Sequence, residues 1–204
     1  AICVPESVPF VLPASIAWED AVNLGNFQLA LALLASNGNL PAQAILVPGA
    51  AGGVATALAQ VARSRGLRVI GTASTPEKRT FALENGVTDL VDGDVQALPK
   101  RVMELTDGRG VDLAFDHVGG ALFIACLRSL APSGMAVSYN ILGGPPTADV
   151  FSEASRLRGP VGVIDFAQDG RNHLLVSAAE GGFRLLVNSN GVLVGINTAA
   201  FQRQ

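Results

Sequence analysis

The sequence predicts an α/β fold in which a doubly wound parallel sheet carries helices on both faces. Three observations predict it. Short apolar runs alternate with longer helical segments from residue 44 onward, and a glycine-rich turn directly follows the first run. The runs are almost continuously hydrophobic, as in strands that are buried on both faces. The 204 residues, 49% hydrophobic and 15% charged, suffice for a globular domain that needs no disulfide or metal to fold.

The expected elements follow in order along the chain. The proline spacing of residues 5–13 favours an extended segment, Ser15 is expected to cap a short helix, and residues 27–35 to form a buried helix. Five strands are then predicted at Ala44–Val47, Arg68–Gly71, Asp89–Val91, Val111–Phe115 and Met135–Tyr139, with helices near residues 53–65, 76–85, 96–105 and 120–130. Two later strand candidates are Pro160–Ile164 and Val192–Ile196.

Composition and charge exclude several classes of partner. The net charge of −3 and the pI of about 5.3 argue against nucleic acid, which needs a clustered basic face. The longest apolar runs are too short for a membrane span. Cys3 and Cys126 lie too far apart for a Cys-x-x-Cys pattern, and the chain starts with no secretory segment. We therefore expect a cytoplasmic protein without nucleic-acid or membrane partners.

The motif that carries chemistry is a glycine-rich loop between the first strand and the helix that follows it. Its residues are Gly49, Ala50, Ala51, Gly52, Gly53 and Val54. In this position backbone N–H groups approach a pyrophosphate, and the helix N-terminus adds partial positive charge. The loop therefore predicts a Rossmann-type dinucleotide site, the alternative being a tight strand-to-helix connection without a ligand.

The end of the second predicted strand discriminates between the two nicotinamide dinucleotides. A site for NAD places Asp or Glu there to bind the ribose 2′-hydroxyl. This chain has hydroxyls and cations instead, among them Ser74, Lys78 and Arg79. A 2′-phosphate needs charge-assisted donors, so NADP(H) is the expected cofactor. The alternative is that the basic pair is only a solvated first turn of a helix.

Several stretches together match a family pattern in order and spacing. They are Glu19 to Ala21, Asn26 to Leu34, Gly49 to Ala55 with Gln60 and Ala62, Ser74 to Lys78, Gly86, Gly108 to Asp112, Asp116 to Gly120 and Leu130 to Gly134. The chain resembles, over about residues 1–145, the zinc-independent quinone oxidoreductase and enoyl reductase branch of the medium-chain dehydrogenase/reductase superfamily.

This resemblance implies an enzyme that transfers hydride from NADPH to a small-molecule quinone, enone or enoyl substrate without a metal. It implies a cofactor held between the Rossmann domain and a preceding barrel-like substrate domain, which we expect to be absent from this chain. Residues 1–40 would be the crossover and leading helices, and residues 41–204 the Rossmann domain. Residues 183–201 resemble the strand through which the family forms a homodimer.

The family pattern also indicates further site residues. Backbone groups of His117, Val118 and Gly119 are expected to contact the cofactor, together with Asn140. Tyr139 replaces a usual glycine, which puts a phenol near the expected nicotinamide position.

Alternatives remain for several of these groups. Tyr139 is a candidate proton donor or simply a packed ring at a strand end. Asp116 is interpreted as a structural carboxylate and Cys126 as core. No zinc site is expected, because His117 and His173 are the only histidines and no ligand cluster is visible.

Three functions from different classes stay open. The chain is a reductase, a cofactor-binding module that is catalytically silent without a separate substrate domain, or a scaffold that kept the fold without the nucleotide.

Overall fold

The computed structural model describes residues 12–36, 41–157, 161–166, 172–177, 183–189 and 192–197. Its helices are α1 (Trp18–Ala21), α2 (Leu24–Ala35), α3 (Gly53–Ser64), α4 (Pro76–Glu84), α5 (Leu98–Leu105), α6 (Gly120–Arg128) and α7 (Val150–Ser155). Its strands are β1 (Ala44–Val47), β2 (Arg68–Thr72), β3 (Asp89–Val91), β4 (Val111–Asp116), β5 (Leu130–Ser138), β6 (Val161–Phe166), β7 (Asn172–Ser177), β8 (Phe183–Ser189) and β9 (Val192–Asn197).

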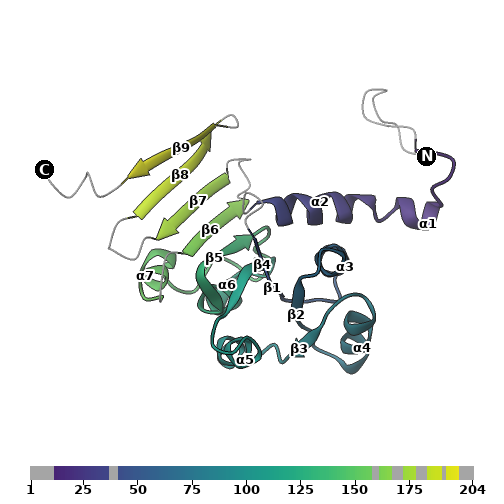
Figure 1. Cartoon of the computed structure of the whole chain (residues 1–204), viewed down its shortest axis with the longest axis horizontal. Coiled ribbons are helices and arrows are strands. Elements are labelled where there is room, and N and C mark those ends of the chain that lie inside the picture. The colour runs from purple at the N-terminus through teal and green to yellow at the C-terminus, as the bar shows by residue number, and fades with distance from the viewer. Residues whose placement is uncertain are drawn as a thin grey trace, which may run out of the picture.

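All the described strands form one sheet in the order β3-β2-β1-β4-β5-β6-β7-β8-β9 (Figure 1). Every pair from β3 to β6 is parallel, and β6 to β9 continue as antiparallel neighbours. The chain winds outward from β1 in one direction to β3 and then in the other direction from β4. The five predicted strands and their parallel pairing are confirmed.

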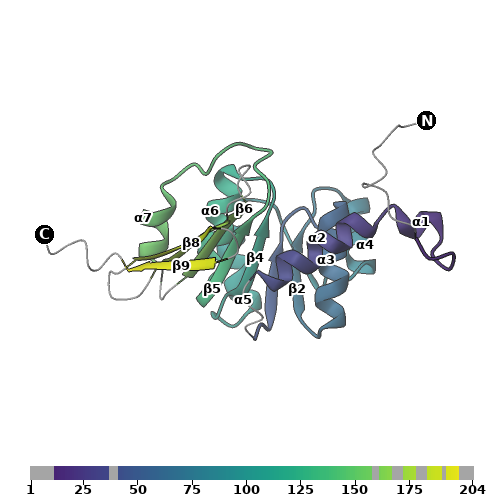
Figure 2. The same cartoon turned by 90° about the horizontal axis from the view of Figure 1, so that it is seen from above.

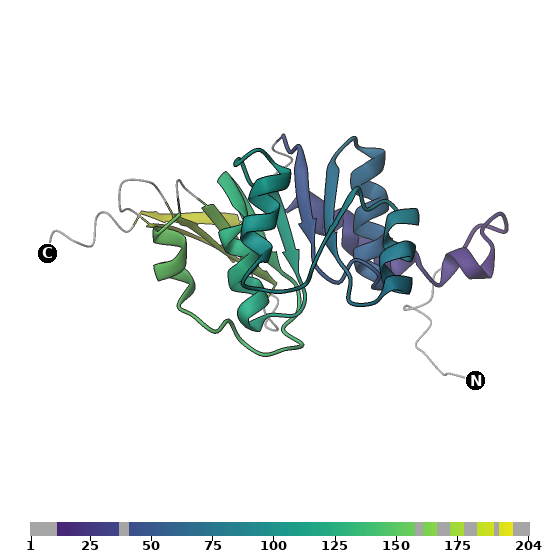
Figure 3. The ribbon, with the colours of Figure 1, turned by 90° about the horizontal axis from the view of Figure 1, so that it is seen from below.

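Helices cover both faces of the parallel part of the sheet, as predicted. Alternate residues of β1 enter two separate cores, with Ile45 and Val47 in one and Leu46 in the other. The first core contains residues of α2 and α3, and Figure 2 shows these helices lying across that face. The second core contains residues of α5 and α6, which lie on the opposite face in Figure 3. Cys126 is fully buried in the second core, as expected.

The first helices differ from the prediction. Ser15 is not a cap, because α1 begins only at Trp18, after Ala17, and no side chain caps it. The predicted helix over residues 27–35 begins earlier, at Leu24, and is not buried all round. The face that carries Leu33 packs against α3, whereas Leu31 on another side of the helix is itself 45% exposed. The proposed domain division at residue 41 separates α2 from α3, two helices that share one core.

The later segments show what the apolar pattern missed. Strand β5 begins at Leu130, earlier than predicted, because Leu130 pairs with Val111 across an irregularity in the β4–β5 register. Both late strand candidates are confirmed as β6 and β9, but α7, β7 and β8 were not predicted. The apolar runs of β7 and β8 are three residues long and lack the regular alternation with helical segments that identified the short β3. Residues 5–11 of the predicted extended segment and Cys3 lie outside the described residues.

Candidate functional site

The parallel strands β1, β2, β4 and β5 end at one edge of the sheet. The residues that follow them there include Gly49 after β1, His117 after β4 and Tyr139 after β5. Connections leave β1 and β4 toward opposite sides of the sheet, and ligands of open α/β sheets bind in the crevice that this arrangement creates. The strand order therefore selects this edge as the candidate site.

Some N–H groups of the glycine loop are used to shape the loop itself. Gly49, with a φ of 62°, donates its N–H to the Thr72 hydroxyl at 3.0 Å. Ala50 donates to the Thr72 carbonyl at 2.8 Å, and Gly52 to the Gly49 carbonyl at 2.9 Å. Thr72, the last residue of β2, thus holds the loop in place. This role of Thr72 could not be predicted from the sequence, because Thr72 and Gly49 are 23 residues apart.

Other N–H groups of the same loop are not used within the described part of the protein and are available to a ligand. Within the part of the chain that the structure describes, the amides of Ala51, Gly53 and Val54 have no acceptor. They stand where α3 begins, and Gly52 before it provides no side-chain cap. Free amides at the positive end of a helix form an anion site. Gly53 also lies against Asn26 of α2, since a Cβ there would be 2.8 Å from Asn26 Nδ2.

His117 and Tyr139 meet beside this loop. The Tyr139 hydroxyl lies 3.3 Å from His117 Nδ1, and the two ring centroids are 5.6 Å apart. The other side of the imidazole covers Gly49, where a Cβ would be only 2.9 Å from His117 Cε1. Burial, with a smaller contribution from the Asp116 carboxylate, raises the pKa of Tyr139. The phenol therefore stays protonated at neutral pH.

Asp116 organises the turn after β4. Its carboxylate is buried and accepts the N–H groups of Val118 at 3.1 Å and Gly119 at 2.7 Å. Burial raises the pKa of Asp116, and these two hydrogen bonds oppose the rise. The geometry agrees with the interpretation of Asp116 as a structural carboxylate.

The loop after β5 covers that turn. Gly143 donates its N–H to the Val118 carbonyl at 2.6 Å, and the Gly144 carbonyl accepts the Gly120 N–H at the start of α6. Gly119 has a φ of 79°, and a Cβ on it would lie 2.2 Å from the Gly144 carbonyl oxygen. The backbone groups of Val118 and Gly119 that were expected to contact a cofactor are thus bonded within the protein. Asn140 lies exposed at the same edge, and its Oδ1 accepts the Ile141 N–H at 2.8 Å.

The predicted 2′-phosphate residues stand at the end of β2 and the start of α4. Thr75 caps this helix by accepting the Lys78 N–H at 3.3 Å. Ser74 and Lys78 are exposed, and no ion-pair partner of Lys78 is found among the described residues. Arg79 is different, because its guanidinium pairs with Asp92 just beyond β3 at 3.3 Å. Asp92 was not singled out in the sequence, although its place directly after a predicted strand end could have indicated it.

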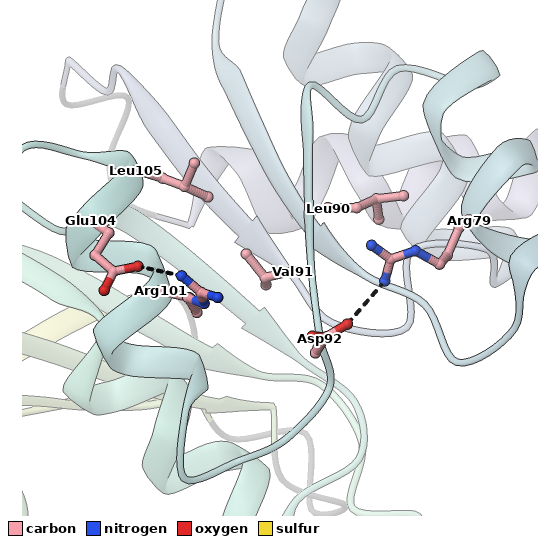
Figure 4. Close-up of a pocket in the computed structure, with 7 residues that line it drawn as sticks. All are labelled: Arg79, Leu90, Val91, Asp92, Arg101, Glu104 and Leu105. Atoms are coloured by element: carbon pink, nitrogen blue, oxygen red, sulfur yellow. Dashed lines mark hydrogen bonds and ion pairs between the residues drawn. The ribbon is translucent and has the colours of Figure 1, made fainter.

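A cavity of about 270 Å³ lies next to this ion pair (Figure 4). Its lining combines the apolar side chains of β3 and α5 with two ion pairs on its rim. The lining residues are Arg79, Leu90, Val91, Asp92, Arg101, Glu104 and Leu105.

Neither a metal-binding cluster nor a membrane-spanning helix is found among the described residues. No group of three or more His, Cys, Asp or Glu side chains there is arranged to hold a metal ion. None of the described helices combines the length and the apolar character that a membrane span requires. The absence of zinc stays a prediction.

The parallel strands, the glycine loop after β1 and the helices on both faces define a Rossmann-type α/β domain. Residues 53–164 match the model of the family described as zinc-binding dehydrogenase. The chain belongs to this family, and its relatives place it in the quinone oxidoreductase branch of the medium-chain dehydrogenase/reductase superfamily, which confirms the resemblance.

Relatives and solved structures of this branch match about half of the chain or more. A quinone oxidoreductase of Pseudomonas aeruginosa is 37% identical over 105 residues, which are 52% of this chain and 32% of that protein. A 2-haloacrylate reductase of a Burkholderia species is 35% identical over 104 residues, covering 51% of this chain and 31% of that protein. The structure of the Escherichia coli quinone oxidoreductase complexed with NADPH matches with a TM-score of 0.63 and 29% identity, over 70% of this chain and 44% of that one. The chain thus spans about a third of the length of the curated relatives.

Proposed function

We propose that this chain binds NADPH across the carboxyl edge of its sheet, with the pyrophosphate at the start of α3. The observation that carries the proposal is the set of free amides of Ala51, Gly53 and Val54, which have no acceptor among the described residues. Three N–H donors at an uncapped helix start fit a pyrophosphate. The Escherichia coli quinone oxidoreductase, which shares the fold, is complexed with NADPH.

We further propose that Ser74, Lys78 and Arg79 recognise the adenosine 2′-phosphate. The exposed Lys78 lies at the N-terminal end of α4, where the helix dipole also favours an anion. Segment 71–76, which joins β2 to α4, contains no Asp or Glu that would bind a 2′-hydroxyl instead. The site therefore favours NADPH over NADH.

The proposed reaction is hydride transfer to a quinone, an enone or an enoyl substrate. Bound NADPH supplies the hydride. The substrate then needs one proton at the oxygen or carbon that gains electrons, and we propose that the Tyr139 hydroxyl donates it. The phenol is protonated at neutral pH, and its hydroxyl lies 3.3 Å from His117 Nδ1 at the edge where the nicotinamide is proposed to bind; solvent returns its proton after each turnover. Asn140 and the backbone of His117 are proposed to orient the nicotinamide.

A second candidate function is a cofactor-binding module that is catalytically silent without a separate substrate domain. In its favour, the groups proposed above to bind the nucleotide all lie on the Rossmann-type sheet and the loops and helices that connect its strands. Both candidates share NADPH binding and differ only in turnover.

Fluorescence titration with NADPH and NADH tests the shared step. We expect saturable binding of both nucleotides, tighter for NADPH, and a loss of the preference in Lys78→Gln. Lys100→Gln is the control, because Lys100 is an exposed lysine on a different helix, α5; its side chain is 83% accessible, and its ammonium lies 3.9 Å from the Glu104 carboxylate. Absence of saturable binding would contradict both candidates and favour a scaffold. Enone-dependent oxidation of NADPH then separates them, because binding without turnover identifies the silent module.

The proposed assembly is a cytoplasmic homodimer. Strand β9 lies at the edge of the described sheet and pairs there only with β8, so its other side is free to extend a sheet. Light scattering coupled to gel filtration tests this proposal, and a strict monomer at high protein concentration would contradict it.

A further inference from the structure

Arg79 and Asp92 form an ion pair that joins two elements at the proposed 2′-phosphate position. The pair spans from α4 to the residue after β3, with Arg79 Nη1 3.3 Å from Asp92 Oδ1 (Figure 4). The Asp92 side chain is 84% exposed and that of Arg79 is 37% exposed. An exposed pair of this kind contributes little to stability, so another anion can replace the carboxylate at low cost.

A ribose 2′-phosphate is such an anion. It carries close to two negative charges and three acceptor oxygens, whereas a carboxylate carries one charge. Arg79 directly follows Lys78, the exposed cation that we propose to bind the same phosphate. The 2′-hydroxyl of NADH is neutral and cannot compete with Asp92 for the guanidinium.

We propose that Asp92 sets the coenzyme preference of this site by competing with the 2′-phosphate for Arg79. In the free protein the Arg79 guanidinium pairs with Asp92, and in the complex it pairs instead with the 2′-phosphate of NADPH. Asp92 therefore weakens the binding of NADPH and leaves the binding of NADH unchanged. The inference rests on the proposed function, because it requires the nucleotide to bind at this edge.

The same cavity offers a matched control. Arg101 Nη1 pairs with Glu104 Oε2 at 2.7 Å, and both residues lie on α5, on the other side of the cavity from Arg79 (Figure 4). Removing the charge of Glu104 changes the net charge of the rim as much as removing that of Asp92. It does not release Arg79.

The test measures the Kd of NADPH and NADH for wild type, Asp92→Asn, Arg79→Gln, the double variant and Glu104→Gln. Release of Arg79 from an exposed ion pair, worth a fraction of a kcal/mol, predicts on the order of threefold tighter NADPH binding in Asp92→Asn. Arg79→Gln should weaken NADPH binding roughly tenfold, as expected for a lost charge-assisted contact. The gain from Asp92→Asn should vanish in the double variant, and Glu104→Gln should match wild type. Circular dichroism confirms that each variant is folded.

Several results would overturn the proposal. Unchanged or weaker NADPH binding in Asp92→Asn does so, as does an equal gain in Glu104→Gln or a gain that persists without Arg79. A wild type that binds neither nucleotide overturns the proposed function and this inference together. A wild type that binds NADPH, with no response to Asp92→Asn, overturns the inference alone.

Discussion

Replacing Gly49 by Ala probes the contact between the glycine loop and His117. Gly49 has a φ of 62°, which lies in the left-handed region, and an added Cβ would lie 2.9 Å from His117 Cε1 and 3.3 Å from Nε2. The substitution therefore adds backbone strain and also displaces the imidazole from the position in which it bonds the Tyr139 hydroxyl.

The two costs can be estimated separately. Left-handed backbone costs an alanine roughly 1–2 kcal/mol. Loss of the hydrogen bond between His117 and the Tyr139 hydroxyl costs about 0.5–1.5 kcal/mol more. We expect Gly49→Ala to lower the free energy of unfolding by about 1.5–3.5 kcal/mol, which corresponds to a Tm lower by roughly 3–14 °C in a domain of this size.

Urea denaturation followed by circular dichroism measures this change, with Gly66→Ala as the matched control. Gly66 has a φ of 80°, and an added Cβ there meets nothing within 4 Å, so its substitution carries only the strain. In a His117→Ala background, Gly49→Ala should cost no more than Gly66→Ala does. Equal destabilisation by the two glycine substitutions in the wild-type background would refute the reasoning.

Two further predictions concern stability. Burial would raise the pKa of Asp112, but hydrogen bonds from Arg109 and from the Ala44 and Gln43 amides outweigh it and lower this pKa below its ordinary value. A lowered pKa in the folded state adds stability that is lost as the pH falls through it. Asp112→Asn should therefore cost about 1–3 kcal/mol at pH 7 and approach wild type in acid; a urea-midpoint difference that does not vary with pH would contradict this. Thr56→Val should raise the free energy of unfolding by roughly 1 kcal/mol, since the buried Thr56 hydroxyl has no partner among the described residues, and a lower urea midpoint would show that it has one.

The parallel sheet could be predicted because each strand can be recognised from its own short stretch of sequence. Each of β1, β2 and β4 is a nearly unbroken apolar run, and burial on both faces requires such a run. The exposed side of α2 could not be predicted, because the apolar residues of Leu24–Ala35 surround the helix and only packing against α3 selects a face. Likewise, Ser15 has the right chemistry for a cap, but α1 begins three residues later.

The candidate site was predicted to the extent that its residues are neighbours in sequence. The glycine loop and Lys78 were indicated by their places after predicted strands, and Tyr139 by the family resemblance. Thr72 and Asp92 were not indicated, because each acts on a residue that only the folding of the sheet brings near. Gly49, the partner of Thr72, lies 23 residues away beyond the adjacent strand, and Arg79, the partner of Asp92, lies 13 residues away in α4. The sequence of the glycine loop also does not show which of its amides shape the loop and which remain free to bind a ligand.

That last distinction can be tested at Gly53, the first residue of α3. Gly53→Pro and Gly53→Ala both add a Cβ near Asn26, but only proline removes the free N–H. Proline suits the first helical position, and Gly52 before it already has the extended backbone that a following proline requires, with φ −78° and ψ 156°. We expect similar urea midpoints for the two variants and NADPH binding weaker by roughly tenfold in Gly53→Pro, from the loss of one hydrogen bond to a charged group. Equal NADPH affinity in the two would show that this amide does not bind the pyrophosphate, whatever the affinity of the wild type.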